Sequence, residues 1–278
     1  MYEIKKKSEM ADGSVIRFDI KAPKIAEKIE PGQFVIVRTH EGGERIPLTV
    51  ADADKDDGTI SIVFQVVGKT TALMRSLGEG DSIKDLAGPL GRPSDIENVG
   101  TVIVVGGGTG IAIMHHITKG LKAAGNEVIG IIGARNSDLL IFEKEMEILC
   151  DQLIVTTDDG SAGRKGFVTQ PLEELLQNRD DINLVFAIGP IIMMKNACAL
   201  TKKYDVKTMV SLNPIMIDGT GMCGGCRVEV GEETKFCCVD GPEFDGHKVD
   251  FEKLQMRNNM YATEEKDSLL SSIKLRGK

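Results

Sequence analysis

Four side chains near the end of the chain have the spacing of a redox-metal loop. Residues 218–226 read Asp-Gly-Thr-Gly-Met-Cys-Gly-Gly-Cys, and another cysteine stands at position 238. Plant-type [2Fe–2S] proteins use C-x4-C-x2-C followed by a distant cysteine. The chain repeats that spacing with an aspartate in the first position. The predicted ligands of a [2Fe–2S] cluster are therefore Asp218, Cys223, Cys226 and Cys238.

The glycines of this segment suit it to wrapping a cluster, because backbone amides face sulfur most easily at φ angles that glycine adopts cheaply. A zinc site of three cysteines and one carboxylate is the alternative, since C-x2-C is also a zinc spacing. Cys237 stands beside Cys238 and leaves two candidates for the last ligand. Cys150 and Cys198 fall in predicted helices and are interpreted as buried small side chains.

A second candidate site is a glycine loop between an apolar strand and a helix. Strand, glycine loop and helix together predict a dinucleotide site, where the helix N-terminus meets a pyrophosphate. The spacing is not G-x-G-x-x-G, and no acidic residue ends the next strand. Arg135 can accept a 2′-phosphate, whereas Asp158 and Asp159 can bond a ribose and repel that phosphate. The choice between NAD(H) and NADP(H) stays open. The loop residues are Gly106, Gly107, Gly108, Thr109 and Gly110.

Short strands with turn signals predict a small antiparallel β-barrel over residues 1–97. One helix, residues 70–77, interrupts it, and residues 88–93 have the composition of a linker. The predicted strands are Glu3–Lys7, Ser14–Ile20, Gln33–Thr39, Ile46–Ala51, Thr59–Val67 and Ser82–Leu86.

Residues 98–212 change to apolar runs that alternate with helical segments, which predicts an α/β domain with a parallel sheet. Residues 213–278 are expected to form a small third module that holds the cysteines. The predicted strands are Thr101–Val105, Glu127–Ile132, Gln152–Thr156, Asn183–Ile188 and Lys207–Leu212, and the helices are Ile111–Ala124, Ile141–Leu149, Val168–Asn178 and Ile191–Lys203.

Composition narrows the class of protein. A chain of 278 residues is long enough for two or three modules. A net charge of -8 disfavours nucleic acid and anionic membranes as partners. No apolar run approaches the roughly 20 residues of a membrane span, and no signal peptide follows the N-terminal lysines. The expected location is the cytoplasm.

The order of the motifs resembles the ferredoxin–NADP reductase superfamily. Arg45-Ile46-Pro47-Leu48-Thr49 is similar to its flavin motif, while the glycine loop and Gly189-Pro190-x-x-Met193 are similar to its nicotinamide motifs. The cysteine segment resembles that of dihydroorotate dehydrogenase electron-transfer subunits. It is more similar to the small subunit of NADH-dependent reduced ferredoxin:NADP oxidoreductase, also called sulfide dehydrogenase, because an aspartate replaces the first cysteine.

The resemblance implies FAD on the barrel and a nicotinamide dinucleotide on the α/β domain. A hydride would pass between the nicotinamide and the flavin, after which single electrons leave through the cluster. Met193 is as readily interpreted as core packing. The implied flavin-binding residues are Arg45, Pro47, Leu48 and Thr49, with Gly68, Lys69, Thr70 and Thr71 as the phosphate-side loop.

The resemblance also implies a partner, a larger flavin and [4Fe–4S] subunit that completes an electron-bifurcating heterodimer. Two alternatives stay open, a dihydroorotate dehydrogenase electron-transfer subunit and a zinc-bearing dinucleotide sensor. The tail from Phe251 to Lys278 can dock a partner or pack on its own domain through Phe251, Leu254, Leu269, Leu270 and Ile273.

Overall fold

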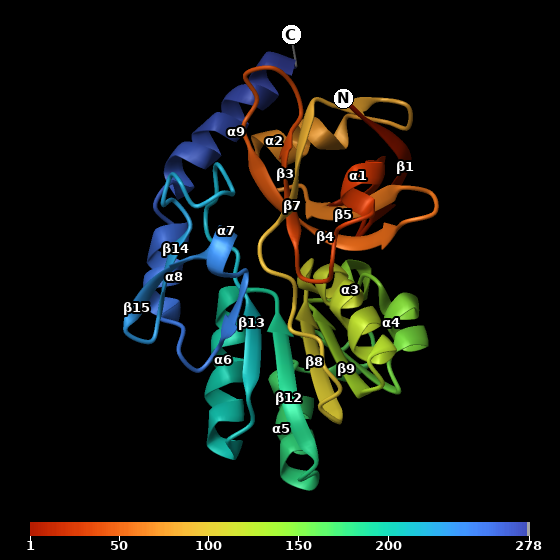
Figure 1. Ribbon diagram of the computed structural model, residues 1–278, viewed down its shortest axis with the longest axis vertical. Coiled ribbons are helices and arrows are strands. Elements are labelled where there is room, and N and C mark those ends of the chain that lie inside the picture. Colours follow the sequence, from red (N-terminus) through yellow and green to blue (C-terminus); the bar gives the residue numbers. More distant parts are fainter. Residues whose placement is uncertain (277–278) are drawn as a thin grey trace.

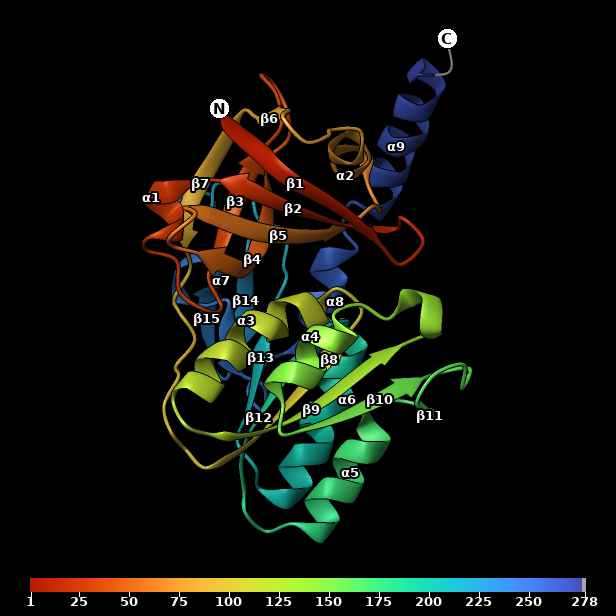
Figure 2. The ribbon, with the colours of Figure 1, turned by 90° about the vertical axis from the view of Figure 1, so that its right-hand side faces the viewer.

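The computed structural model describes residues 1–276, with side chains placed through residue 270, and contains two large sheets (Figure 1). The N-terminal sheet is antiparallel and curls into a half-barrel, which confirms the predicted antiparallel architecture (Figure 2). Two short helices, α1 (Pro23–Ala26) and α2 (Lys69–Arg75), accompany it. Its strands in spatial order are β6 (Ser82–Ile83), β1 (Tyr2–Met10), β2 (Val15–Lys21), β5 (Thr59–Gln65), β4 (Ile46–Asp54), β3 (Phe34–Arg38) and β7 (Asp85–Leu90).

The half-barrel forms because alternate residues of its strands are apolar and face one interior. Phe18 on β2 and Phe64 on β5 are both buried there, with their rings edge to face at 5.3 Å. The predicted linker begins too early, since β7 continues through Gly88 to Leu90. Gly88 permits this because a Cβ there would lie 2.6 Å from Val35 Cγ1 on β3.

The second sheet is parallel except at one edge, as the alternation of strands and helices predicted. Its final strand belongs to the C-terminal region and runs antiparallel to its neighbour. The C-terminal region therefore shares this sheet, and the boundaries 1–97, 98–212 and 213–278 stay a prediction. The strands in spatial order are β11 (Arg164–Lys165), β10 (Gln152–Thr157), β9 (Glu127–Ala134), β8 (Thr101–Gly107), β12 (Ile182–Ile188), β13 (Thr208–Ser211) and β16 (Glu243–Asp245).

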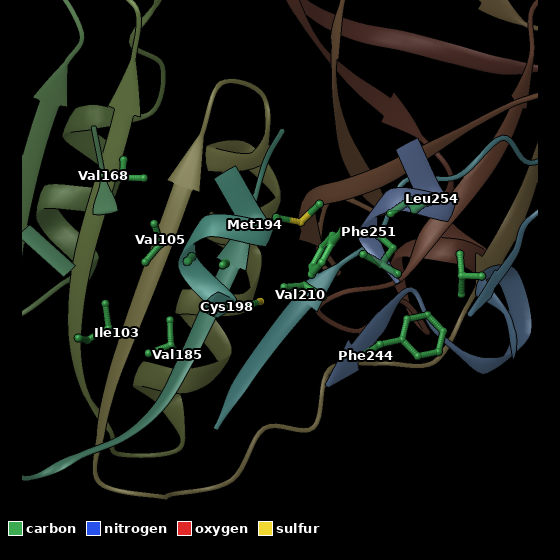
Figure 3. Close-up of a cluster of buried hydrophobic side chains, with 14 of the residues drawn as sticks. Ile103, Val105, Val168, Val185, Met194, Cys198, Val210, Phe244, Phe251 and Leu254 are labelled. Carbon is green, nitrogen blue, oxygen red and sulfur yellow. The ribbon is translucent and has the colours of Figure 1, made fainter. Parts of the chain in front are cut away.

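Helices cover both faces of this α/β sheet because its central strands are apolar on both faces. Val102 and Val104 face α3 (Gly110–Ala123) and α4 (Glu143–Leu149). Ile103 and Val105 face α5 (Thr169–Asn178) and α6 (Ile191–Thr201), as Figure 3 shows for part of that core. Two 3₁₀ turns, Ser137–Leu139 and Lys202–Tyr204, complete the α/β connections.

The C-terminal region packs on the α/β domain through its helix α8 (Phe251–Asn258). It comprises the hairpin β14 (Arg227–Val230) and β15 (Glu233–Phe236), then α7 (Cys237–Asp240), α8 and α9 (Ala262–Arg276). Phe251 and Leu254 of α8 are buried beside Met194 and Val210 (Figure 3).

The last helix, α9, lies alongside α2 (Figure 1). Leu269 is half-buried and Leu270 is exposed, while the side chain of Ile273 lies outside the described residues. No helix within residues 1–276 combines the length and apolar character needed to cross a lipid bilayer.

Helix α3 joins the two sheets, because it lies between the α/β sheet and the half-barrel (Figure 2). His115 donates from Nδ1 to Ala51 O at 3.1 Å, and His116 donates from Nδ1 to Val50 O at 3.2 Å. Both rings are buried. Burial lowers the pKa of each imidazole, so both histidines are neutral hydrogen-bond donors at neutral pH.

We expect the free energy of unfolding to fall as the pH drops below about 6.5, the ordinary histidine pKa. The unfolded chain then binds protons that the folded chain resists, because the folded-state pKa of His115 and His116 is lowered. Urea unfolding at several pH values measures this slope. The double variant His115→Gln/His116→Gln should flatten it, whereas the exposed control His40→Gln should not. An unchanged slope in the double variant would contradict this assignment.

Candidate functional site

A cavity of about 550 Å³ opens where the carboxyl ends of β8, β9, β10 and β12 meet the half-barrel. Open α/β sheets bind their ligands at this edge, where the chain leaves the strands. The cavity is therefore the candidate dinucleotide site. Seven residues that the sequence indicated line it, namely Gly107, Gly108, Thr109, Arg135, Asp158, Pro190 and Met193.

The remaining glycines of the predicted site shape the cavity without lining it. A Cβ on Gly110 would lie 2.2 Å from the Ile188 carbonyl oxygen, so only glycine lets α3 start this close to β12. Gly106 is packed under Ile111 and Met114, and Gly189 lies against the Gly107 backbone. The glycine loop thus serves both close helix–strand packing and access to a ligand.

Of two neighbouring aspartates that the sequence indicated, one lines the cavity and the other does not. Arg135 and Asp158 are both exposed and line the cavity. Asp159 does not line it, and its carboxylate accepts hydrogen bonds from Ser161 N at 2.9 Å and Ser161 Oγ at 2.6 Å. Those bonds lower the pKa of Asp159. Asp158 is consequently the acidic residue placed with Arg135.

The half-barrel supplies part of the same cavity, which the sequence did not indicate. Residues from the β1–β2 turn and the end of β5 contribute Ala11, Ser14, Val15 and Gln65. The Asp12-Gly13 signal predicts a turn but does not say what the turn faces. A ligand in this cavity would touch both sheets.

The segment that resembles a flavin motif lies at the start of β4. Pro47, Leu48 and Thr49 are half-buried and pair with β3. Arg45 is exposed, and its guanidinium donates to Ile217 O at 3.0 Å and to Asp218 O at 3.3 Å. The predicted flavin segment therefore adjoins the segment that carries the predicted metal ligands.

The predicted phosphate-side loop opens α2 and lies beside the same segment. Gly68 is the N-cap, and Thr71 Oγ1 accepts from Gly68 N at 2.9 Å and from Val67 N at 3.1 Å. The Thr70 hydroxyl donates to the Glu44 carboxylate, which stands just before Arg45. Lys69 is exposed. The structure thus brings the two predicted flavin-binding segments together.

The segment of residues 217–226, named here the cysteine loop, is organised around a carboxylate. Asp218 accepts hydrogen bonds from Thr220 N, Met222 N and Cys223 N at 3.0–3.2 Å, and Cys223 Sγ lies 3.4 Å from Asp218 Oδ1. Desolvation raises the pKa of Asp218, but these hydrogen bonds outweigh it and lower the value to about 2. Asp218 is therefore ionised and oriented toward Cys223.

The two candidates for the last ligand differ in what their thiols face. Cys238 N donates to Cys226 Sγ at 3.4 Å, and burial together with the neighbouring Cys226 raises the pKa of Cys238 to about 12. The Cys237 thiol instead lies 3.5 Å from Leu212 O, away from the loop. The geometry favours Cys238.

The donors thus form two pairs, Asp218 with Cys223 and Cys226 with Cys238. Two of the sulfurs already accept backbone N–H groups, since Gly225 N lies 3.4 Å from Cys223 Sγ and Cys238 N bonds Cys226. Among the side chains of residues 1–270, no three His, Cys, Asp or Glu groups stand close enough to hold a single metal ion. The positive φ of Gly219, Gly221 and Gly224 gives the loop its shape.

Comparison with known proteins places these sites in a family. The iron–sulfur cluster binding domain of dihydroorotate dehydrogenase B matches residues 213–250, and the oxidoreductase NAD-binding domain matches residues 104–199. The dihydroorotate dehydrogenase B (NAD(+)) electron transfer subunit homolog of Thermotoga maritima is 49% identical over 99% of this chain and 96% of that protein. The chain belongs to this family of electron-transfer subunits and their homologues.

Other members extend the comparison. The dihydroorotate dehydrogenase B electron transfer subunit of Fusobacterium nucleatum is 31% identical over 85% of this chain and 93% of that protein. A chain from the structure of the NADH-dependent reduced ferredoxin–NADP oxidoreductase, studied for flavin-based electron bifurcation, superimposes with a TM-score of 0.92. It is 48% identical, and the match covers 96% of both chains. The predicted fold and family resemblance are confirmed.

Proposed function

We propose that this chain is an oxidoreductase subunit that carries electrons between a nicotinamide dinucleotide and a larger partner subunit. FAD on the half-barrel and a [2Fe–2S] cluster in the cysteine loop would connect the two. The observation that carries the proposal is the contact of Arg45 with the Ile217 and Asp218 carbonyls, because it joins the flavin segment to the ligand segment. The match to the ferredoxin–NADP oxidoreductase chain supports a place in an electron-bifurcating complex. The proposed partner is a larger flavin and [4Fe–4S] subunit, with which this chain would form a heterodimer.

The residues present fit such a cluster. In a [2Fe–2S] cluster each of the two irons binds two protein donors, and the cysteine loop together with Cys238 presents four donors as two pairs. Asp218 is already ionised, and backbone amides already face two sulfurs, which is the polarity that thiolates require. Asp218, Cys223, Cys226 and Cys238 would hold the group.

When bound, FAD exchanges two electrons with a nicotinamide and releases them singly. Arg45 supplies a positive charge for a pyrophosphate, and Thr49 supplies a hydroxyl at the inner end of the motif. The cavity shared by both sheets would hold the dinucleotide against the half-barrel. His115 and His116 take no part as acids or bases in this proposal, because neither lines the cavity and both rings are buried against the half-barrel, where they donate to Ala51 O and Val50 O.

Anaerobic reconstitution with FAD, iron and sulfide tests the proposal. We expect flavin and cluster absorbance that NADH or NADPH bleaches, together with a paramagnetic resonance that appears when the cluster is reduced. A chain that shows neither flavin absorbance nor that resonance would refute the proposal. Zinc without iron or sulfide would instead support the dinucleotide sensor.

A second candidate keeps the electron-transfer chemistry and changes the partner. The family match over residues 213–250 and the Fusobacterium nucleatum relative both favour a dihydroorotate dehydrogenase electron-transfer subunit. Purifying the chain with its native partner separates the two. A flavin and [4Fe–4S] protein supports the bifurcating complex, whereas an FMN enzyme that oxidises dihydroorotate supports the alternative.

The preference between the two dinucleotides is expected to depend on Asp158. Replacing Asp158 with asparagine should strengthen NADPH binding relative to NADH about tenfold, because it removes a carboxylate that repels the 2′-phosphate beside Arg135. Fluorescence titration with both dinucleotides measures the ratio. Asp159→Asn is the matched control, since that carboxylate bonds Ser161 and does not line the cavity. Equal effects of the two substitutions would contradict this placement.

A further inference from the structure

Three arginines from separate parts of the chain donate hydrogen bonds to carbonyls of the cysteine loop. Arg45, just before β4, reaches Ile217 O and Asp218 O. Arg227, the first residue of β14, donates from Nη1 to Gly224 O at 3.1 Å. Arg257 on α8 donates from Nη2 to Gly225 O at 3.0 Å. Every carbonyl held in this way belongs to a predicted ligand or to a residue adjacent to one.

These arginines differ from most other arginines of the described fold, because none of the three forms an ion pair with a carboxylate among the described side chains. Arg38 and Arg179, by contrast, pair with Asp85 and Asp181. The three guanidinium charges beside the loop are therefore not neutralised by ion pairs with the described carboxylates.

Arg227 and Arg257 lie next to the same hollow. Both line a hollow of about 280 Å³ between β14 and α8, which lie side by side (Figure 1). The Nε of Arg257 is buried and has no hydrogen-bond partner among residues 1–270. A buried donor without a partner costs free energy, and another contact of the same side chain must offset that cost. The hydrogen bond from Arg257 Nη2 to Gly225 O is such a contact.

The planar peptide links these contacts to the sulfurs. In a trans peptide the carbonyl and the following N–H point in opposite directions. When Arg227 holds the Gly224 carbonyl, the Gly225 N–H is turned to the other side, and there it lies 3.4 Å from Cys223 Sγ. Arg257 fixes the next peptide in the same way, because it holds the Gly225 carbonyl that precedes the Cys226 N–H.

We propose that Arg227 and Arg257 are positioning residues that orient the amides of the cysteine loop and raise the reduction potential of the cluster bound there. The proposal rests on the function proposed above. Reduction adds a negative charge to a cluster, and both guanidinium groups and N–H groups aimed at sulfur stabilise that charge. Removing either arginine removes a positive charge and loosens an oriented amide.

The midpoint potential of the reconstituted full-length chain tests this. In Arg227→Gln and Arg257→Gln, we expect the ratio of reduced to oxidised cluster at a fixed potential to fall up to tenfold, which is a shift of about 59 mV for one electron. Lysine at either position should recover part of the shift, because it restores the charge without the planar fork. Arg164→Gln is the matched control, because Arg164 pairs with Glu174 instead of a carbonyl of the cysteine loop. It lies on β11, at the opposite edge of the sheet from β16 and the C-terminal region.

A second measurement needs no cluster. Hydrogen exchange of the Gly225 amide in the iron-free chain should be faster in Arg227→Gln than in the wild type or in Arg164→Gln. If the wild type takes up no cluster, the proposed function fails, and the exchange rates still decide the positioning role. If the cluster loads normally while the potential and the exchange rate stay unchanged in the glutamine variants, the positioning role is overturned and the proposed function stands.

Discussion

Replacing Cys238 with serine is expected to abolish cluster binding, whereas the same change at Cys237 leaves it intact. Iron–sulfur clusters prefer soft thiolate ligands, and Asp218 would already supply one hard donor here, so the cluster should not be retained when a neutral hydroxyl replaces one of the three thiolates. Cys238 stands beside Cys226, while the Cys237 thiol faces the Leu212 carbonyl, which a serine hydroxyl can also bond. Iron content after reconstitution should fall from about two atoms per chain to near zero in Cys238→Ser only.

The neighbouring cysteines form a closely matched pair, since both are buried on the same short helix. Thermal unfolding of the two iron-free variants checks that the fold itself is unaffected. If Cys238→Ser retains iron and Cys237→Ser loses it, the fourth ligand is Cys237. Iron retained by both variants would remove this segment from the ligand set.

Gly110→Ala is expected to lower the free energy of unfolding by about 3 kcal/mol or more, which is large for one methyl group. The added Cβ would lie 2.2 Å from the oxygen and 2.6 Å from the carbon of the Ile188 carbonyl. Those atoms belong to the backbone of the central strand β12, so α3 would have to move away. The residues just before α3, Gly107, Gly108 and Thr109, line the dinucleotide cavity and would move with it. Urea unfolding and NADH titration should therefore report loss of stability and of binding together.

Gly108→Ala in the same loop separates close packing from backbone strain. Gly108 has a φ of +55° and nothing within 4 Å of an added Cβ. Alanine there should cost about 1 kcal/mol, the usual penalty of a left-handed conformation. Equal losses of stability in the two variants would show that the approach of α3 to β12 does not limit position 110.

Local patterns in the sequence predicted the elements and much of the candidate site. Strand, glycine loop and helix occur in order over residues 101–123, and a continuous apolar run defines the strand without reference to distant parts of the chain. The spacing of Asp218, Cys223 and Cys226 is likewise local, because a single loop must place all three. The predicted linker at residues 88–93 began too early because the close approach of Gly88 to Val35 involves two distant segments.

Residue type and order along the chain therefore determined the two sheets, the glycine loop and the cysteine spacing, since each follows from short-range periodicity or loop geometry. Only the tertiary structure distinguished Asp158 from Asp159 and Cys238 from Cys237, because adjacent residues of one type differ only in the groups that they face. It also brought Arg45, Arg227 and Arg257 to one loop. Those contacts join segments far apart in the chain, and no local pattern records which distant carbonyl an arginine will reach.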